Sequence, residues 1–203
     1  MRTSKTTEAH ALYEDAPIES HPWEPFVPAG AKILLLGTFP PGDHRWSMDF
    51  YYPNPTNDFW PMMGLILLGR RDALCNASGR GFDLDAIRSL MTEHRIALSD
   101  TARKVRRLRG NASDKYLDIV ETVDLRGLLS RMPECRTVAT TGEKAASVIA
   151  ALTDTDIPKM GEMVTCAEGL NIWRMPSTSR AYPVPLAKKA EYYAAMFRHC
   201  GII

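Results

Sequence analysis

The sequence predicts an α/β fold of three αβα layers, in which helices cover both faces of a central, mainly parallel four-stranded sheet. Apolar runs of strand length alternate with segments of helical spacing from residue 31 onward. The first run, at 32–36, contains four successive Ile or Leu residues, which is typical of a strand buried on both faces. Strands separated by helices favour parallel pairing, because a parallel connection needs a long crossover segment.

Residues 1–28 are expected to form an N-terminal leader strap, and residues 29–203 a single α/β domain. Four prolines within 17–28 are expected to break any regular element there. Trp23 and Phe26 are the large apolar residues of this segment. We expect them to anchor the strap on the domain.

The first half of the domain is expected to supply two strands and two helices. The apolar run at 32–36 is the first strand. In 57–69 the apolar residues recur at helical spacing, and Pro61 falls in the first turn, where a helix tolerates it. Residues 83–94 repeat that spacing, and 95–99 is a second short strand.

The second half is expected to complete the sheet and its helical layers. Helical spacing of apolar residues recurs in three segments, at 124–132, 142–152 and 183–199. The remaining strand-like runs lie at 137–141, 163–166 and 170–175, and the last two form either a hairpin or two separate strands.

Composition is that of an ordinary globular chain. Hydrophobic residues make up 45% of the 203 and charged residues 24%, which excludes a wholly disordered protein. The longest apolar stretch, at 62–68, is far too short to span a bilayer, and the first residues lack the apolar core of a signal peptide. We therefore expect a cytoplasmic protein without a membrane partner. The net charge of +1 indicates no partner by itself.

The four cysteines give no metal-binding pattern. They stand at 75, 135, 166 and 200, and no two form a C-x-x-C pair. We expect reduced thiols, with neither a zinc site nor an iron–sulfur cluster.

Polar loops follow the predicted parallel strands. Their sequences are GTFPPG from 37, DT at 100–101, TGEK from 141 and MPSTSR from 175. In an open α/β sheet, ligands bind outside the carboxyl ends of the strands. The edge at which these loops meet is therefore the expected site.

The first of these loops is rich in rings. Residues 37–60 include Trp46, Phe50, Tyr51 and Tyr52, which are many aromatic residues for a solvated loop. A bound planar group would account for them, since stacking of a base on an aromatic ring is worth roughly 1–3 kcal/mol. A loop packed by its own rings accounts for them equally well.

A basic run follows the second strand. Between residues 101 and 115, six Lys or Arg residues oppose Asp114 alone, a local net charge of +5. Such a cluster suits a polyanion such as a nucleic-acid backbone, although a solvated face is the alternative. The loop at 175–180 adds three hydroxyls and Arg180, which are common phosphate ligands but also common turn residues.

Together these segments resemble the uracil-DNA glycosylase superfamily, most closely its mismatch-specific and hypoxanthine-DNA glycosylase branch. The resemblance covers about 31–197. Its first motif, a strand followed by Gly-x-x-Pro, matches 37–40, and the stretch N/H-P-x-N-x-F-W matches 54–60. A strand ending in Asn/Asp-Thr matches 100–101, and the x-Pro-Ser motif matches 175–177.

The resemblance implies an activity and roles for particular residues. Enzymes of this superfamily extrude a damaged or mispaired base from duplex DNA into a pocket and hydrolyse its N-glycosidic bond. Tyr52 matches the aromatic residue on which the base stacks, and Asp100 the residue that binds the base edge. Asn57 matches an asparagine implicated in catalysis in the hypoxanthine branch. Phe39 is expected on the same base-binding wall.

The resemblance also implies contacts with DNA. The Pro-Ser loop would enter the minor groove and pinch the backbone, with Arg180 at its tip in place of an apolar wedge. The start of the helix after the third strand is an expected phosphate contact. The predicted DNA-binding residues are Pro176, Ser177, Thr178, Ser179, Arg180, Gly142, Lys144, Lys104, Arg106 and Arg107.

Three positions depart from the family pattern. Phe39 stands where many relatives carry Asp, Asn or Glu, and Met175 where some carry His or Asn. Catalysis is therefore expected to rest on Asn57, whose carbonyl can orient a water. Asp43, His44 and Asp49 are candidates to compensate, and a plain surface role is the alternative for each of them.

Asp100 replaces an asparagine. An ionised carboxylate only accepts hydrogen bonds, so it would favour a base edge that offers N–H groups and would repel O4 of uracil. We therefore predict a preference for a deaminated purine such as hypoxanthine. The alternative is that Asp100 is a helix cap or turn residue.

The function predicted is that of a monofunctional DNA glycosylase of base-excision repair, a hydrolase that acts as a monomer on DNA containing a modified base and needs no cofactor or metal. A catalytically silent, nucleic-acid-binding member of the superfamily is the alternative. An unrelated small-molecule hydrolase is the third interpretation, but no G-x-S-x-G motif is present.

Overall fold

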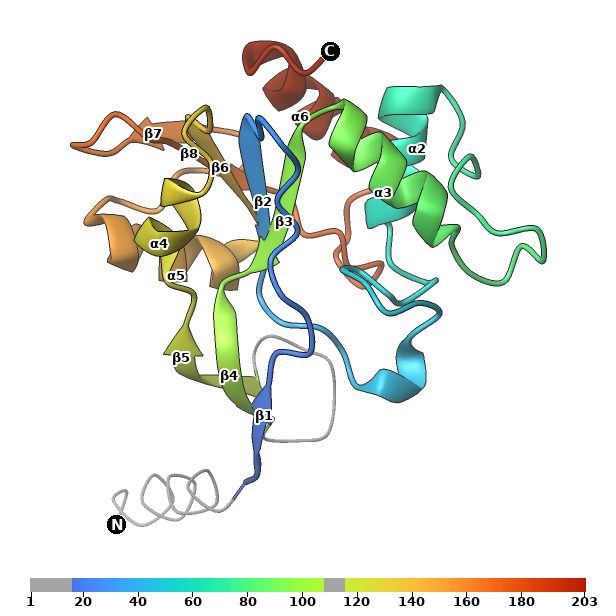
Figure 1. Ribbon diagram of the computed structural model, residues 1–203, viewed down its shortest axis with the longest axis horizontal. Coiled ribbons are helices and arrows are strands. Elements are labelled where there is room, and N and C mark those ends of the chain that lie inside the picture. The colour runs from blue at the N-terminus through green and yellow to red at the C-terminus, as the bar shows by residue number, and fades with distance from the viewer. Residues whose placement is uncertain (1–15, 108–115) are drawn as a thin grey trace.

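The computed structural model describes residues 16–107 and 116–203, and it is built around a five-stranded sheet (Figure 1). The order of strands in this sheet is β3-β2-β6-β8-β7. Its members are β2 (Ile33–Gly37), β3 (Ile96–Asp100), β6 (Thr137–Thr141), β7 (Met163–Thr165) and β8 (Asn171–Met175). The first four in spatial order are parallel, as predicted, and β7 is added at one edge as the antiparallel partner of β8.

Helices cover both faces of this sheet (Figure 1). One layer contains α2 (Phe59–Leu68), α3 (Leu84–Glu93) and α6 (Leu186–His199), and the other contains α4 (Leu125–Ser130) and α5 (Glu143–Thr153). These layers confirm the predicted three-layer αβα class, and every helix and strand predicted from residue 31 onward is present with its ends shifted by a few residues.

The central strand β2 shows why both faces need a helical layer. Successive side chains of a strand point to opposite faces of the sheet. Ile33 and Leu35 accordingly join the apolar cluster beneath α2, α3 and α6, whereas Leu34 and Leu36 join the cluster beneath α4 and α5. All four are fully buried.

A second sheet stands at the carboxyl end of the first (Figure 1). It is antiparallel, with the order β1-β4-β5, and contains β1 (Ile18–Ser20), β4 (Ala102–Arg107) and β5 (Leu117–Thr122). Only Thr101 separates the end of β3 from the start of β4. The sequence did not predict this sheet, and it places much of the basic run in a strand.

The strap before the domain is partly regular. The prediction that prolines exclude any regular element from 1–28 is wrong for β1, which pairs with β4 from Ile18 opposite Arg106 to Ser20 opposite Lys104. Pro17 precedes the strand and β1 lies at an edge, where proline is tolerated. Residues 1–15 lie outside the described residues.

Trp23 and Phe26 anchor the strap, as predicted. The ring of Trp23 lies 4.7 Å from that of Trp46, and Phe26 forms an isolated bridge with Leu98 of β3. The strap therefore crosses the edge of the main sheet on its way from β1 to β2.

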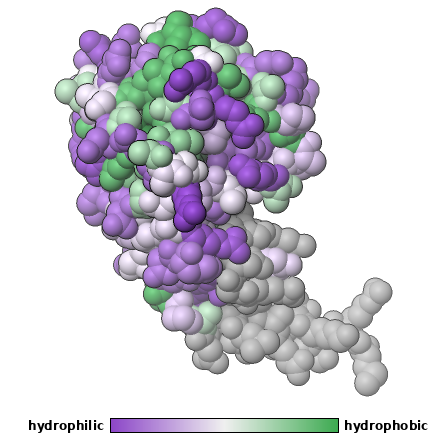
Figure 2. Space-filling view, turned by 90° about the vertical axis from the view of Figure 1, so that its right-hand side faces the viewer, coloured by the Kyte–Doolittle hydropathy of each residue, from purple (hydrophilic) through white to green (hydrophobic). Residues whose placement is uncertain are grey.

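Other features concern the surface and the cysteines. Figure 2 looks onto the side formed by α2 and α3, where apolar residues gather in the upper part and hydrophilic residues predominate lower down.

Among the described helices, none combines the length and the apolar character that crossing a bilayer requires. The four cysteines are free thiols, and burial raises the pKa of Cys135.

Candidate functional site

A pocket of about 650 Å³ opens at the carboxyl ends of the parallel strands. The loops that follow β2 and β8 line it together with the last residues of β3 and β6, as expected for this edge of an α/β sheet. Its wall includes Gly37, Phe39, Tyr52, Asn57, Asp100, Thr141 and the loop from Ser177 to Arg180. Gly37 and Arg180, which are 143 residues apart in the sequence, therefore meet at one cavity.

Tyr52 lies in the wall with its ring fixed from two sides. One ring face stacks on Phe59 with centroids 3.7 Å apart and planes at 11°, and the hydroxyl is 3.0 Å from Thr141 Oγ1. The backbone of Tyr52 has a φ of 52°, a left-handed conformation that is costly for a bulky residue. The surrounding contacts hold the ring in that conformation at the edge of the pocket.

Asn57 combines a structural contact with exposure to the pocket. Its Oδ1 accepts a hydrogen bond of 2.8 Å from the N–H of Phe59, the first residue of α2, and so satisfies one of the N–H groups that the helix leaves free, from the residue before the N-cap Asp58. One lone pair of this oxygen is therefore committed. The other lone pair remains for a water, and within the described chain the amide N–H₂ donates to no other residue.

Asp100, the last residue of β3, is held by a histidine that the sequence did not indicate. His21 Nε2 lies 2.9 Å from Asp100 Oδ2, and the side chains are 0% and 8% exposed. The other oxygen, Oδ1, lies so close to Gly37 that a Cβ there would collide with it. The interpretation of Asp100 as a helix cap is wrong, because no helix begins at this position.

The Pro-Ser loop is fixed through its carbonyl oxygens. Tyr193 of α6 donates to Pro176 O at 3.0 Å, and the N–H of Asp58 donates to Thr178 O at 2.9 Å. Lys189 Nζ of α6 donates to Ser179 O at 2.8 Å. Burial raises the pKa of Tyr193, so its hydroxyl remains a donor.

Lys189 also forms a buried ion pair. Its side chain is 0% exposed, and its Nζ lies 2.8 Å from Asp58 Oδ2. Asp58 Oδ1 lies 3.5 Å from Nε of Arg180, at the tip of the loop. Lys189 stands among the apolar, buried positions of α6, and this placement is the one sequence signal for the network.

Of the remaining predicted residues, Phe39 lines the pocket, whereas Gly142 and Lys144, at the start of α5, do not. Phe39 makes an edge contact with the ring of His21, 5.4 Å between centroids. Gly142 precedes α5 with φ 131° and ψ 173°, a conformation open almost only to glycine. A Cβ on Gly142 would lie 3.6 Å from that of Ser177, so the start of α5 adjoins the Pro-Ser loop.

The basic residues of β4 have acidic neighbours on both adjoining strands. Lys104 pairs with Glu121 at 2.6 Å, Arg106 with Asp118 at 3.3 Å and Arg107 with Glu19 at 3.0 Å. Arg107 also donates to Pro40 O, at the rim of the pocket. The acids offset much of the positive charge that the sequence shows. Arg109 and Lys115 lie outside the described residues, and the role of the run in binding DNA stays a prediction.

The residues expected to compensate for the missing polar groups lie elsewhere. Met175 is buried in the core beneath α6, and Asp43, His44 and Asp49 are exposed. None of these four lines the pocket. His44 instead borders a second groove of about 560 Å³, which shares Arg45, Asn54 and Thr56 with the pocket and also contains Arg80.

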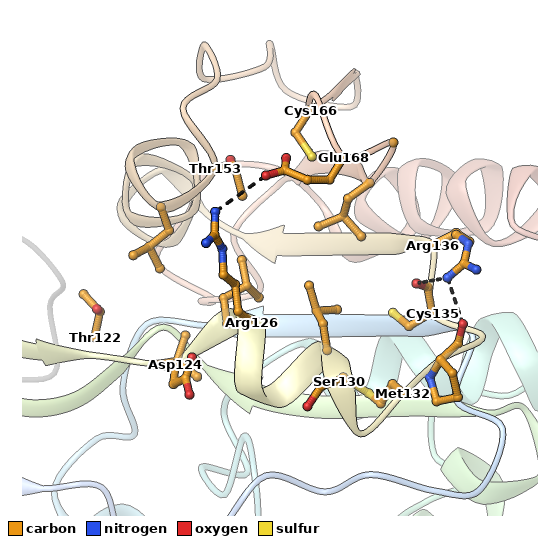
Figure 3. Close-up of a pocket in the computed structure, with 17 residues that line it drawn as sticks. Thr122, Asp124, Arg126, Ser130, Met132, Cys135, Arg136, Thr153, Cys166 and Glu168 are labelled. Carbon is orange, nitrogen blue, oxygen red and sulfur yellow. Dashed lines mark hydrogen bonds and ion pairs between the residues drawn. The ribbon is translucent and has the colours of Figure 1, made fainter.

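A larger cavity of about 1060 Å³ lies against α4 and has a different character (Figure 3). Arg136 and Leu170 in its wall directly precede β6 and β8, so it lies toward the amino ends of these strands. Two of its charged side chains, Arg126 and Glu168, pair with each other at 3.6 Å. Ligands of open α/β sheets bind at the opposite edge, which favours the smaller pocket as the site.

Comparison with solved structures gives a likeness over nearly the whole chain. A "putative Uracil DNA glycosylase" from Methanosarcina acetivorans, solved by solution NMR, aligns with a TM-score of 0.64 and 23% sequence identity over 91% of this chain and 99% of that chain. The two proteins share a fold. No family model matches this chain, and no curated protein does.

Proposed function

We propose that the protein is a DNA N-glycosylase that removes a modified base, and that the carboxyl-edge pocket receives the extruded base. The observation that carries the proposal is the convergence of Tyr52, Asn57 and Asp100 on one pocket beside the fixed Pro-Ser loop. About 650 Å³ lies within the range of roughly 300–1000 Å³ usual for small-molecule pockets and leaves room for a nucleobase. The fold shared with the archaeal protein, which is described as a glycosylase, supports the same proposal.

The roles follow from the chemistry of N-glycosidic cleavage. The bond breaks with positive charge developing on the sugar and negative charge on the departing base. Asn57 would hold the attacking water on the free lone pair of Oδ1, or donate from its amide to the leaving base. Tyr52 would support the base through its ring, and Asp100 would accept from an N–H of the base edge. Both hypoxanthine and uracil carry a ring N–H, so the proposed preference for hypoxanthine rests on repulsion between the carboxylate and O4 of uracil.

DNA phosphates would be bound at the mouth of the pocket. The loop Pro176, Ser177, Thr178, Ser179 and Arg180, with Gly142 and Lys144 beside it, offers hydroxyls, N–H groups and cations. Arg45 and Arg80, in the adjoining groove, have no carboxylate within 4 Å among the described residues, and neither has Lys144. These cations are therefore available to phosphates. We expect a monomer that acts in base-excision repair in the cytoplasm.

The test is an assay of duplexes that each contain one modified base, with strand cleavage at the resulting abasic site as the readout. We expect release of hypoxanthine, and uracil as the sole substrate would refute the purine preference. Asn57→Ser keeps an oxygen that can cap α2 but removes the amide, so activity should fall by a factor of about 100 while the melting temperature stays near that of the wild type.

A silent nucleic-acid-binding protein is the second candidate. It is favoured by the apolar Phe39 and the buried Met175 at positions where relatives carry polar groups. If the wild type binds DNA and leaves every base of the panel intact, this candidate replaces the glycosylase. The hydrolase interpretation has less support, because no His or Cys lies in the described wall of the pocket to pair with its hydroxyls.

A further inference from the structure

We propose that His21 is a positioning residue that fixes Asp100, and thereby selects bases that present a ring N–H to the pocket. It does so by donating from Nε2 to one carboxylate oxygen, which leaves the other as a pure acceptor for the base. The inference rests on the proposed function, since it concerns how that pocket reads its base.

The contact between the two residues is short and shielded. Nε2 and Oδ2 are 2.9 Å apart, and the His21 side chain is 0% exposed. His21 reaches this position because it directly follows β1, and its N–H bonds to Arg103 O of β4 at 2.8 Å.

The surroundings of Nδ1 keep the proton on Nε2. Nδ1 lies 3.2 Å from the N–H of Trp23 and 2.9 Å from its carbonyl oxygen. A neutral ring can accept at Nδ1 from Trp23 N–H, and a charged ring can donate to Trp23 O, and in both states Nε2 carries a hydrogen for Asp100. The remaining tautomer would set the Nε2 lone pair against the carboxylate. Arg103 also donates to Trp23 O, at 2.8 Å, and so helps to fix this carbonyl beside the ring.

Aromatic rings hold the imidazole in this orientation. Tyr51 stacks on it with centroids 5.6 Å apart, and Trp23 and Phe39 meet it edge-on at 5.7 and 5.4 Å. Burial, followed by the nearby Asp100 charge, raises the pKa of Tyr51, so its hydroxyl stays protonated and donates to Glu24 O at 3.1 Å. These three uncharged rings therefore fix the orientation in which the imidazole donates to Asp100.

The other carboxylate oxygen is where selection occurs. Oδ1 lies over Gly37, whose missing side chain makes the approach possible, and both residues line the pocket. An oxygen that only accepts is matched by a ring N–H and opposed by a ring nitrogen with a lone pair. Deamination makes this change: it turns N1 of adenine, an acceptor, into the N–H of hypoxanthine. The His21–Asp100 pair thus discriminates between a deaminated base and the base from which it derives.

The experiment compares two substitutions that differ in the donor. His21→Phe keeps a ring in the cage and removes the N–H, whereas His21→Gln retains an N–H that can reach the carboxylate. On a duplex containing deoxyinosine we expect His21→Phe to lower kcat at least tenfold with little change in KM, because phosphate contacts are untouched. His21→Gln should recover most of the loss. His94→Phe, a substitution outside the pocket, is the control.

A cycle with Asp100→Ala separates positioning from general damage. In that background His21→Phe should alter kcat less than twofold, since the carboxylate that His21 orients is absent. Equal losses in both backgrounds, or equal losses for His21→Phe and His21→Gln at unchanged melting temperature, would overturn the proposal.

A readout without catalysis keeps the inference separate from the proposed function. In long-range ¹H–¹⁵N spectra of the wild type, His21 should show a protonated Nε2, and the Nε2 signal should move in Asp100→Asn. An unprotonated Nε2 would refute the dyad even if the enzyme is active. A protonated Nε2 in a protein that cleaves no base would retain the dyad and refute the glycosylase.

Discussion

Two buried carboxylates flank the pocket, and they are used differently. Asp100 and Asp58 are 6% and 8% exposed, and each binds a buried donor from a distant segment through Oδ2, His21 in one case and Lys189 in the other. The second oxygen of Asp58 is occupied by Arg180. The second oxygen of Asp100 has no such partner among the described residues and lies at the pocket wall. One carboxylate thus holds a loop, and the other retains an acceptor for a ligand.

The largest expected effect concerns Lys189. Lys189→Met leaves Asp58 buried without its ammonium partner, and breaking a buried pair in this way costs about 3–5 kcal/mol of unfolding free energy. Urea unfolding of the variant measures the loss. Lys188→Met removes the neighbouring exposed lysine and is the matched control, for which we expect no measurable change. Equal stability of the two variants would show that the Asp58 pair does not hold the loop.

The second expectation concerns Asp100 itself. Asn at this position can still accept from His21 Nε2, so Asp100→Asn should lower the unfolding free energy by about 1 kcal/mol or less. The ratio of activity on uracil to that on hypoxanthine should rise, because an amide both donates and accepts. A large loss of stability with an unchanged ratio would assign Asp100 the same structural role as Asp58.

A smaller effect is expected for Arg180. Its side chain is half exposed, so Arg180→Ala should change stability by only about 0.2–1 kcal/mol through loss of the Asp58 pair. If Arg180 also contacts a phosphate, the slope of log affinity against log salt should become shallower by about 1 in DNA binding. An unchanged slope would confine Arg180 to the Asp58 network.

The smallest effect separates two lysines that the sequence places together as DNA contacts. Lys104 is paired with Glu121 at 2.6 Å, whereas Lys144 has no carboxylate within 4 Å in the part of the chain described. We expect Lys144→Gln to weaken DNA binding more than Lys104→Gln does, measured by fluorescence anisotropy at two salt concentrations. A larger loss of DNA binding for Lys104→Gln than for Lys144→Gln would show that the β4 residues take part in binding DNA.

The main sheet was predictable because its signals are local. Four Ile or Leu residues in β2 and the helical spacing of α2, α3 and α6 are visible in short windows, and the structure confirms them. The sheet formed by β1, β4 and β5 was not, because the buried residues of β4, Ala102 and Val105, are three apart rather than two. Register shifts around Lys104 account for that spacing.

The site was predictable only in part for a related reason. Tyr52, Asn57 and Asp100 follow strands or precede a helix, so their edge of the sheet could be inferred. Their partners could not, because His21 and Lys189 lie 79 and 131 residues from the carboxylates they bind. The capping contact of Asn57 had a local signal, an asparagine two residues before the helix.

The strap between β1 and β2 has a practical consequence for anyone preparing shortened versions of this chain. A truncation that starts at residue 29 would retain every strand of the five-stranded sheet and every helix of its two layers. It would nevertheless delete the imidazole and the indole behind Asp100, and leave that carboxylate facing a hole. Such a fragment would keep the main sheet and lose the contacts that hold Asp100 at the pocket, so a shortened chain should retain residues 18–28.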